Sequence, residues 1–435
     1  MTAVYLILSL ITIVFYLNRK YLPFILCYIA LMTELFILDT IGSTIRGSDL
    51  CLFMNFVLLP VALCRGGKVN IRAKKINRVV ALFLGFIVFE FLLTIITGSD
   101  TVSYAAKVVR VPLIFVSYYV FRTIPLDIYK KFLKVMLYVT IIQGVLFFLQ
   151  YLGVNLLAGR YDDESFAFVF ALNIPTLTFL YIFFCLDAQY VKKQKYLLVV
   201  FFFLILLMTY VRAFIISAIL GVLLYIVMVR GIQRSISLIA GILLLLPIAF
   251  NIMERKSEVS GSSLSTQEEI ALLFSGIENV RQVGGDGGSS IFRIAMLIER
   301  FDYLIHNPEY LLFGVGAIHE DSPNCYNRFS FALGTQNEDR YYGKCLIESG
   351  DITWVPITLR YGLVGIAVHL MIIITILKMA WRRKDLMRIF FPLLLVYFLK
   401  SFDAALFESP WSCVELSLYL AMFARCYMEQ KELIM

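Results

Sequence analysis

The sequence predicts an all-α polytopic membrane protein with one large loop outside the membrane. Of its 435 residues, 60% are hydrophobic and only 16% are charged. Soluble domains carry about 25% charged residues, and a soluble core could not bury this much apolar surface. The apolar residues come in about 13 (12–14) runs of the length that a spanning helix needs. The net charge of +8 does not indicate nucleic-acid binding, because the basic residues lie in short loops between these runs.

The predicted spans fall into two groups on either side of one hydrophilic segment. Residues 1–252 contain ten spans, residues 253–352 form the loop between the tenth and the eleventh, and residues 353–435 contain three spans and a tail. A span needs about 20 mostly apolar residues. The expected spans are 3–17, 21–41, 50–64, 79–97, 106–122, 133–155, 164–186, 195–211, 212–229, 235–252, 353–379, 386–400 and 410–425.

The basic residues predict how the chain is oriented. Alternate connections between spans are rich in Lys and Arg, and the others are acidic or mixed; the basic ones are 18–20, 65–78, 122–131, 191–195, 230–234 and 381–384. Cytoplasmic loops carry this excess of positive charge. We therefore expect the large loop on the outer side of the membrane and the C-terminus in the cytoplasm.

The large loop is predicted to form a small folded cap. Residues 266–280 and 291–305 have helical spacing, and Ser290 and Asn307-Pro308 give a start and a stop for the second helix. Cys325 and Cys345 are the two cysteines of the loop, and they are a candidate disulfide if the loop faces an oxidising compartment.

Several basic residues lie where the membrane disfavours them. Ionisable groups inside spans are costly and tend to face a cavity or a partner. Guanidinium groups match phosphate oxygens bidentately, so an outward-facing cluster could hold a diphosphate. The alternative is that each side chain reaches the headgroups or pairs with a local acid. The cluster comprises Lys107, Arg110, Arg160, Arg212 and Arg360.

The loop adds further candidates for chemistry. Arg293 and His319 are candidates for binding or catalysis, whereas Arg300 lies among acids and is expected to be structural. His306 is a weaker candidate, and His369 lies within a span and is expected to be packed.

The order of features resembles the bacterial O-antigen polymerase and O-antigen ligase superfamily. The sequence TYVRA, which contains Arg212, opens a span and is similar to the family's Ser-Arg at that place. Arg293 is followed by Asn307-Pro308 and by Gly314-Val315-Gly316, and a span with Gly362 to Gly365 then re-enters the membrane. This resemblance covers residues 209–379.

The resemblance implies a glycosyltransferase of the C-type membrane fold that uses undecaprenyl-diphosphate-linked sugars and needs no metal or other cofactor. Arg212 and Arg293 would bind the diphosphate and stabilise its departure. A base would deprotonate the acceptor hydroxyl, and Asp351 or His319 could serve. Gly314 and Gly316 are expected near the substrate. Ligases place His-Asn just before the re-entering span, but this chain has Gly350-Asp351, which favours a repeat-unit polymerase.

The expected function is polymerisation of lipid-linked repeat units into O-antigen, the polysaccharide of lipopolysaccharide, or into another surface polysaccharide. The expected partners are the lipid-linked oligosaccharide, the bilayer, a chain-length regulator and a flippase. The resemblance places this reaction at the periplasmic face of a bacterial inner membrane. The sequence leaves three alternatives open: a glycan ligase with the same chemistry, a transporter or flippase of polysaccharide precursors, and a sensor or assembly scaffold.

Overall fold

The part of the chain that the structure describes is mostly α-helical. The computed structural model describes residues 2–32, 47–66, 71–150, 160–162, 167–169, 174–186, 195–208, 212–229, 289–331, 333, 345–347, 352–382, 384–402, 407 and 409–429. Its α-helices are α1 (Thr2–Leu17), α2 (Tyr21–Met32), α3 (Gly47–Arg65), α4 (Ile71–Ile96), α5 (Val102–Leu113), α6 (Ser117–Phe121), α7 (Leu126–Gln150), α8 (Ile174–Leu186), α9 (Lys195–Met208), α10 (Arg212–Val229), α14 (Ser289–His306), α15 (Pro323–Arg328), α17 (Trp354–Trp381), α18 (Lys384–Lys400) and α19 (Pro410–Glu429).

Four short elements lie between these helices. The 3-10 turn η1 (Ile114–Val116) joins α5 to α6, and η4 (Pro308–Tyr310) follows α14. Strands β1 (Arg160–Asp162) and β2 (Ala167–Val169) pair antiparallel, with Tyr161 opposite Phe168.

Several helices are suited to a membrane. Within the described residues, five helices are long and apolar enough to cross one: Gly47–Arg65, Lys74–Ile96, Val102–Phe121, Leu126–Leu149 and Trp354–Trp381. Large apolar side chains point outward from them and from shorter helices, with Leu10 62% exposed and Ile96 81% exposed. Such broad apolar surfaces are stable in lipid and not in water. The all-α membrane class predicted from the sequence is therefore confirmed, whereas the count of 13 spans remains a prediction.

Two predicted elements can be compared closely with the structure. The cap helix expected at 291–305 is α14, which ends one residue before Asn307 as expected. The span expected to begin at residue 164 was wrong at its start: residues 167–169 form a strand and the helix begins at Ile174. Pro175, the second residue of that helix, suits a first turn because its missing N–H would have no helical partner. The span at 235–252, the helix at 266–280 and most of the loop before α14 lie outside the described residues.

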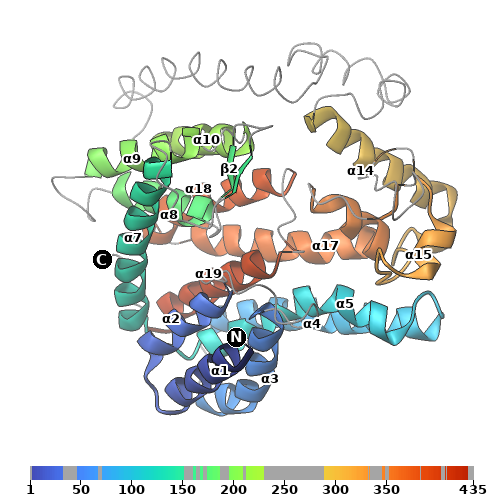
Figure 1. Cartoon of the computed structure of the whole chain (residues 1–435), viewed down its shortest axis with the longest axis horizontal. Coiled ribbons are helices and arrows are strands. Elements are labelled where there is room, and N and C mark those ends of the chain that lie inside the picture. The colour runs from blue at the N-terminus through green and yellow to red at the C-terminus, as the bar shows by residue number, and fades with distance from the viewer. Residues whose placement is uncertain are drawn as a thin grey trace.

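The helices form a bundle with the cap at one end. Figure 1 shows α4 beside α5, α17 and α19, with α15 near the connection from α4 to α5 and α14 packed on α17. We call this end the cap end and call residues 289–331 the cap. At the centre of the bundle, the His369 ring lies 5.0 Å from that of Phe83 and 4.9 Å from that of Phe407, and its Nδ1 donates to the Gly365 carbonyl at 2.7 Å. His369 is therefore a packed core residue, as expected.

Helix α17 is broken at Gly362, and the backbone of the cap fills the break. Gly362 has φ 59° and ψ −159°, outside the helical region. The amides of Val315 and Gly316 donate to the carbonyls of Leu359 and Arg360 at 2.9 and 3.0 Å. On the other side of the break, the amides of Leu363 and Val364 donate to the carbonyls of Leu311 and Leu312, both at 3.0 Å. A broken helix within a bilayer needs such partners, because lipid supplies none.

Two glycines make this close approach possible. A Cβ on Gly314 would lie 2.4 Å from the Arg360 carbonyl carbon, and a Cβ on Gly362 would lie 2.6 Å from the Gly314 amide nitrogen. Both residues also have positive φ, 70° and 59°, which side chains rarely adopt. Gly314 and Gly362 are therefore required by the backbone geometry of the break.

We expect Gly314→Ala and Gly362→Ala to loosen the cap from α17. The positive φ alone costs about 1–3 kcal/mol for a residue with a side chain, and the backbone clash adds to it. Thermal unfolding of the purified protein in detergent should show a clearly lower midpoint for both variants. Gly85→Ala is the matched control, because a Cβ there meets nothing within 4 Å. An unchanged midpoint in the Gly314 and Gly362 variants would contradict this account of the break.

Candidate functional site

The cap is also fastened to the connection between α4 and α5. The Asp100 carboxylate accepts hydrogen bonds from the His319 amide at 3.0 Å and from the Ser322 hydroxyl at 2.6 Å. One turn before the end of α4, the Thr94 hydroxyl accepts from the Ala317 amide at 2.7 Å. Asp100 and Thr94 are buried. Residues 317–322 are thus held by side chains at the cap end of the bundle as well as by α17.

His319 is held in one tautomer by its own loop. Its Nδ1 lies 3.0 Å from the backbone amide of Asp321, which can only donate. Nδ1 must therefore accept, and the single proton of the neutral ring lies on Nε2. The ring stacks on Tyr104 of α5 at 5.9 Å between centroids. Nδ1 also lies 3.8 Å from the Asp321 carboxylate, and with Nδ1 accepting from the amide the Nε2–H can donate to a ligand.

Two cations of α5 lie beside this ring pair. The Lys107 ammonium lies 4.8 Å from the centroid of the Tyr104 ring, and Lys107 is exposed. One turn further along α5, the Arg110 guanidinium lies 3.2 Å from the Asp49 carboxylate at the start of α3. Both members of this ion pair are partly exposed, and such pairs contribute only about 0–1 kcal/mol. Arg110 can therefore exchange Asp49 for an anionic ligand at little cost.

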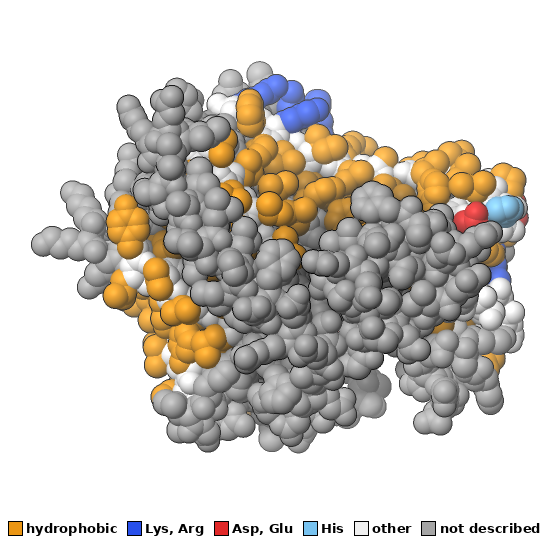
Figure 2. Space-filling model, turned by 90° about the horizontal axis from the view of Figure 1, so that it is seen from above, with side chains coloured by type: hydrophobic (Ala, Val, Ile, Leu, Met, Phe, Trp, Pro, Cys, Tyr) orange, Lys and Arg blue, Asp and Glu red, His pale blue; other side chains and the backbone are white. Residues whose placement is uncertain are grey.

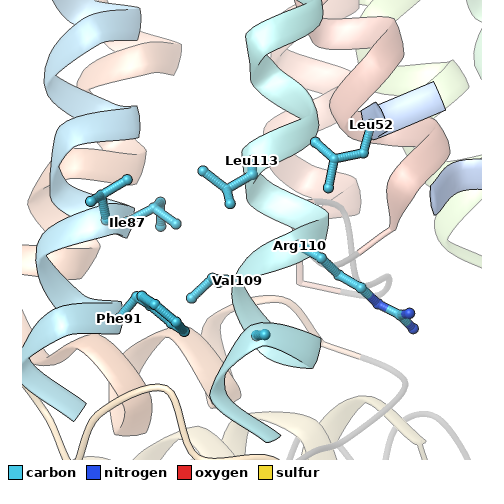
Figure 3. A pocket seen from close by; sticks show the side chains of 8 residues that line it. Leu52, Ile87, Phe91, Val109, Arg110 and Leu113 are labelled. Carbon is cyan, nitrogen blue, oxygen red and sulfur yellow. The ribbon is translucent and has the colours of Figure 1, made fainter. Parts of the chain in front are cut away.

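An apolar cavity opens next to Arg110, between α3, α4 and α5. Its volume is about 270 Å³, and Arg110 is its one charged lining residue. In Figure 3 the guanidinium of Arg110 extends away from the side chains of Ile87 and Phe91. The lining residues are Leu52, Ile87, Val88, Phe91, Ala106, Val109, Arg110 and Leu113. The cavity thus offers hydrocarbon contacts along its walls and a cation at its edge.

The remaining predicted residues are placed as follows. Arg360 is 2% exposed and its Nε donates to the Ile318 carbonyl at 3.0 Å, so it anchors the cap and does not face the cavity. Arg293 lies half-buried on α14, which packs against α17. Arg212 is the first residue of α10 and Arg160 the first of β1. Asp351 lies outside the described residues.

The structure therefore divides the predicted residues into groups. Lys107, Arg110 and His319 gather around α5 at the cap end, beside the cavity. Gly314, Gly316 and Arg360 belong to the junction between the cap and α17. The junction and the α5 group are continuous, because His319 follows the carbonyl that Arg360 binds.

The candidate disulfide is absent from the structure. Cys325 and Cys345 are both buried and are not joined to each other. Cys325 packs on α15 in the apolar core of the cap, while the Cys345 carbonyl accepts from the Phe331 amide at 2.8 Å. Cys325 and Cys345 thus make different contacts. Arg300 is structural, as expected: its guanidinium donates to Glu299 at 2.7 Å and to the Leu346 carbonyl at 2.9 Å, and burial lowers its pKa to about 10.

A buried polar network in α18 and α19 was missed by sequence reasoning. Lys400 ends α18, is 8% exposed, and has its ammonium 4.4 Å from the ring of Phe214. The hydroxyls of Tyr397 and Tyr419 both donate to the Glu415 carboxylate. Phe214 lies two residues after Arg212, so Lys400 brings a second cation to the start of α10. The sequence signal for this network is Lys400, a lysine at the end of an apolar run.

Glu90 was also missed. It is the one charged residue in the apolar stretch 79–97, it is fully buried, and neither carboxyl oxygen has a hydrogen-bond partner among the described residues. It lies one turn from Thr94, below the point where the cap docks. A buried acid without a partner is carried in its neutral form.

The described residues contain no group of three or more His, Cys, Asp and Glu side chains that could hold a metal ion. Comparison with models of protein families gave no match, and comparison with curated proteins gave none either. The chemistry of the site is therefore inferred from its own geometry.

We expect Asp100→Ala to release the cap from the α4–α5 connection. Each hydrogen bond to a charged acceptor contributes about 1.5–3 kcal/mol, so losing these bonds should increase the open population about tenfold or more. Limited proteolysis should then cleave the cap correspondingly faster. The matched control is Asp302→Ala, which removes an exposed acid of α14 whose side-chain partner is His306. Equal cleavage rates in wild type and Asp100→Ala would exclude this role.

Proposed function

We propose that the protein polymerises undecaprenyl-diphosphate-linked oligosaccharide repeat units at the periplasmic face of a bacterial inner membrane. The observation that carries this proposal is an apolar cavity with the cation of Arg110 at its edge, on a helix whose first turn lies beside the docked cap. Such a site fits a ligand with a long hydrocarbon chain and an anionic head group. In this arrangement the cap is periplasmic and the C-terminus cytoplasmic.

The parts of the site suit the parts of such a donor. The cavity would take the stretch of prenyl chain next to the diphosphate, since hydrocarbon transfers favourably onto apolar walls. Arg110 and Lys107 would hold phosphate oxygens, with Arg110 leaving Asp49 to do so. The Nε2–H of His319 would donate to the same anion.

The proposed reaction is a single displacement. A sugar hydroxyl of one repeat unit attacks the anomeric carbon of the growing chain, a new C–O bond forms, and the bond to the diphosphate breaks. Undecaprenyl diphosphate leaves with the bonding electron pair, and cations stabilise its developing charge. The hydroxyl proton passes to a base. Asp351 and His319 are the two candidates for that base. Arg212 and Arg293 stay predicted diphosphate ligands, and Lys400 supports the end of α10 that carries Arg212.

The break in α17 favours an enzyme over a transporter. In transporters with broken helices, the free backbone groups at the break bind the substrate or its coupling ion. Here the carbonyls of Leu359 and Arg360 and the amides of Leu363 and Val364 are all paired with the cap. The break therefore serves to hold a polar cap in place.

The proposal is tested by the length of the surface glycan. A strain lacking the gene would be complemented with wild type, with Lys107→Ala/Arg110→Ala, or with Arg212→Ala or Arg293→Ala, at matched membrane levels. We expect glycan capped at a single repeat unit in the uncomplemented strain and at least tenfold less polymer in the variants, as loss of charge-assisted bonds predicts. Lys131→Ala, an exposed lysine of α7, is the matched control.

Other outcomes separate the alternatives. Full-length polymer that stays on its lipid carrier would indicate a ligase, and repeat units retained on the cytoplasmic face would indicate a flippase. Normal ladders in all the variants would exclude the proposed residues.

Filling the cavity tests the lipid-binding part separately. Ala106→Trp places a large ring among the lining residues and should strongly reduce polymer length and yield by excluding the prenyl chain. Ala81→Trp is the matched control, because Ala81 is exposed on α4 and does not line the cavity. Equal ladders for both variants would show that the cavity does not bind the donor.

A further inference from the structure

Helix α14 of the cap is apolar on part of its exposed side as well as on its buried side. Its exposed positions carry Ile294, Phe301 and Ile305, which are 39%, 38% and 54% exposed. Its buried positions carry Ala295, Met296 and Leu304 together with the ion pair of Glu299 and Arg300. Residues 294, 301 and 305 lie seven and four positions apart, so they form one stripe along the helix. The buried side already packs on the protein, so the stripe is a second, outward apolar surface.

The stripe continues into the turn that follows α14. Leu312 is 55% exposed and Phe313 is 37% exposed. The Phe313 ring lies 5.4 Å from that of Phe89 on α4, and Phe89 is itself 44% exposed. Phe89 belongs to the outward face of α4 that also carries Leu92. The apolar surface of the cap and the lipid-facing surface of a spanning helix are therefore one continuous surface.

The surface seen in Figure 2 agrees with this description. Hydrophobic side chains run as a band across the described part of that face, and the few acidic and His side chains lie at one end of it. At the C-terminal end of α14, between the stripe and the turn Leu311–Phe313, His306 and Asp302 form an exposed pair at 3.5 Å.

We infer that α14 and the turn Leu311–Phe313 dip into the bilayer at the cap end and rest among the lipid headgroups and upper acyl chains. The occupant of the stripe is lipid because the same surface, without interruption at Phe89 and Phe313, continues onto a helix that spans the membrane. A protein partner would have to cover both the cap and the lipid-facing side of α4. This inference does not depend on the proposed function.

The consequence is that the membrane helps to hold the cap. Thr94 and Asp100 fix the cap from the side of the bundle, and the stripe fixes it from the side of the lipid. The cap then lies over the bundle with its polar face toward Lys107 and Arg110 and its apolar face in the bilayer.

The inference is tested with a fluorescent probe attached to single cysteines that are introduced into the cap. Cys64, which is exposed, and Cys27, which is half-buried, would first be replaced by Ser. Phe301→Cys and Ile305→Cys report on the stripe, and Asn327→Cys and Ser330→Cys, both exposed on other parts of the cap, are the matched controls. Each variant is labelled with bimane and reconstituted into vesicles of phosphatidylethanolamine and phosphatidylglycerol.

We expect nitroxide-labelled lipid to quench the probes at 301 and 305 several-fold more than those at 327 and 330. Iodide in the water should show the opposite order. Equal quenching by iodide at all four positions would overturn the inference, because the stripe would then face water. Protection of 301 and 305 from both quenchers would also overturn it, because a protein segment would then cover the stripe.

Discussion

Four backbone hydrogen bonds between the cap and the two halves of α17 are the constraint on which the rest of the cap depends. A spanning helix that stops and restarts leaves amides and carbonyls without partners, and each costs several kcal/mol in hydrocarbon. The cap removes that cost because its backbone enters the break with matching donors and acceptors at Leu311, Leu312, Val315 and Gly316. The break and the docked cap are therefore one feature, since neither is stable without the other.

The position of the charged groups follows from this junction. Because Val315 and Gly316 are fixed against α17, the next residues reach Thr94 and Asp100, and His319 arrives beside Tyr104. A loop that was joined to the membrane helices only at its ends would not hold an imidazole ring in one tautomer next to α5. The rigid part of the site thus consists of backbone contacts, and the cations at its edge are the exchangeable part.

Hydropathy and helical spacing predicted the membrane class and α14 correctly, because these depend on residues close together in the sequence. They could not reveal that Gly314 pairs with Gly362, since the requirement for glycine at each position comes from the backbone of the other. Sequence reasoning counted basic residues as unusual in the membrane and overlooked Glu90. Nor could hydropathy and helical spacing reveal the local hydrogen bond from the Asp321 amide to Nδ1 of His319.

The apolar stripe of α14 and the face of the cap toward α5 can be explained together. A substrate with a prenyl chain moves within the bilayer, so its diphosphate arrives at the level of the headgroups and its sugars project beyond them. A cap that faced only water would stand away from that level. Under the proposed function, a cap that rests in the bilayer through α14, and holds His319 against α5, would lie at the depth where such a diphosphate is bound. The exposed apolar stripe of α14 and the cations of α5 would then serve the same substrate, whose diphosphate stays at the membrane surface.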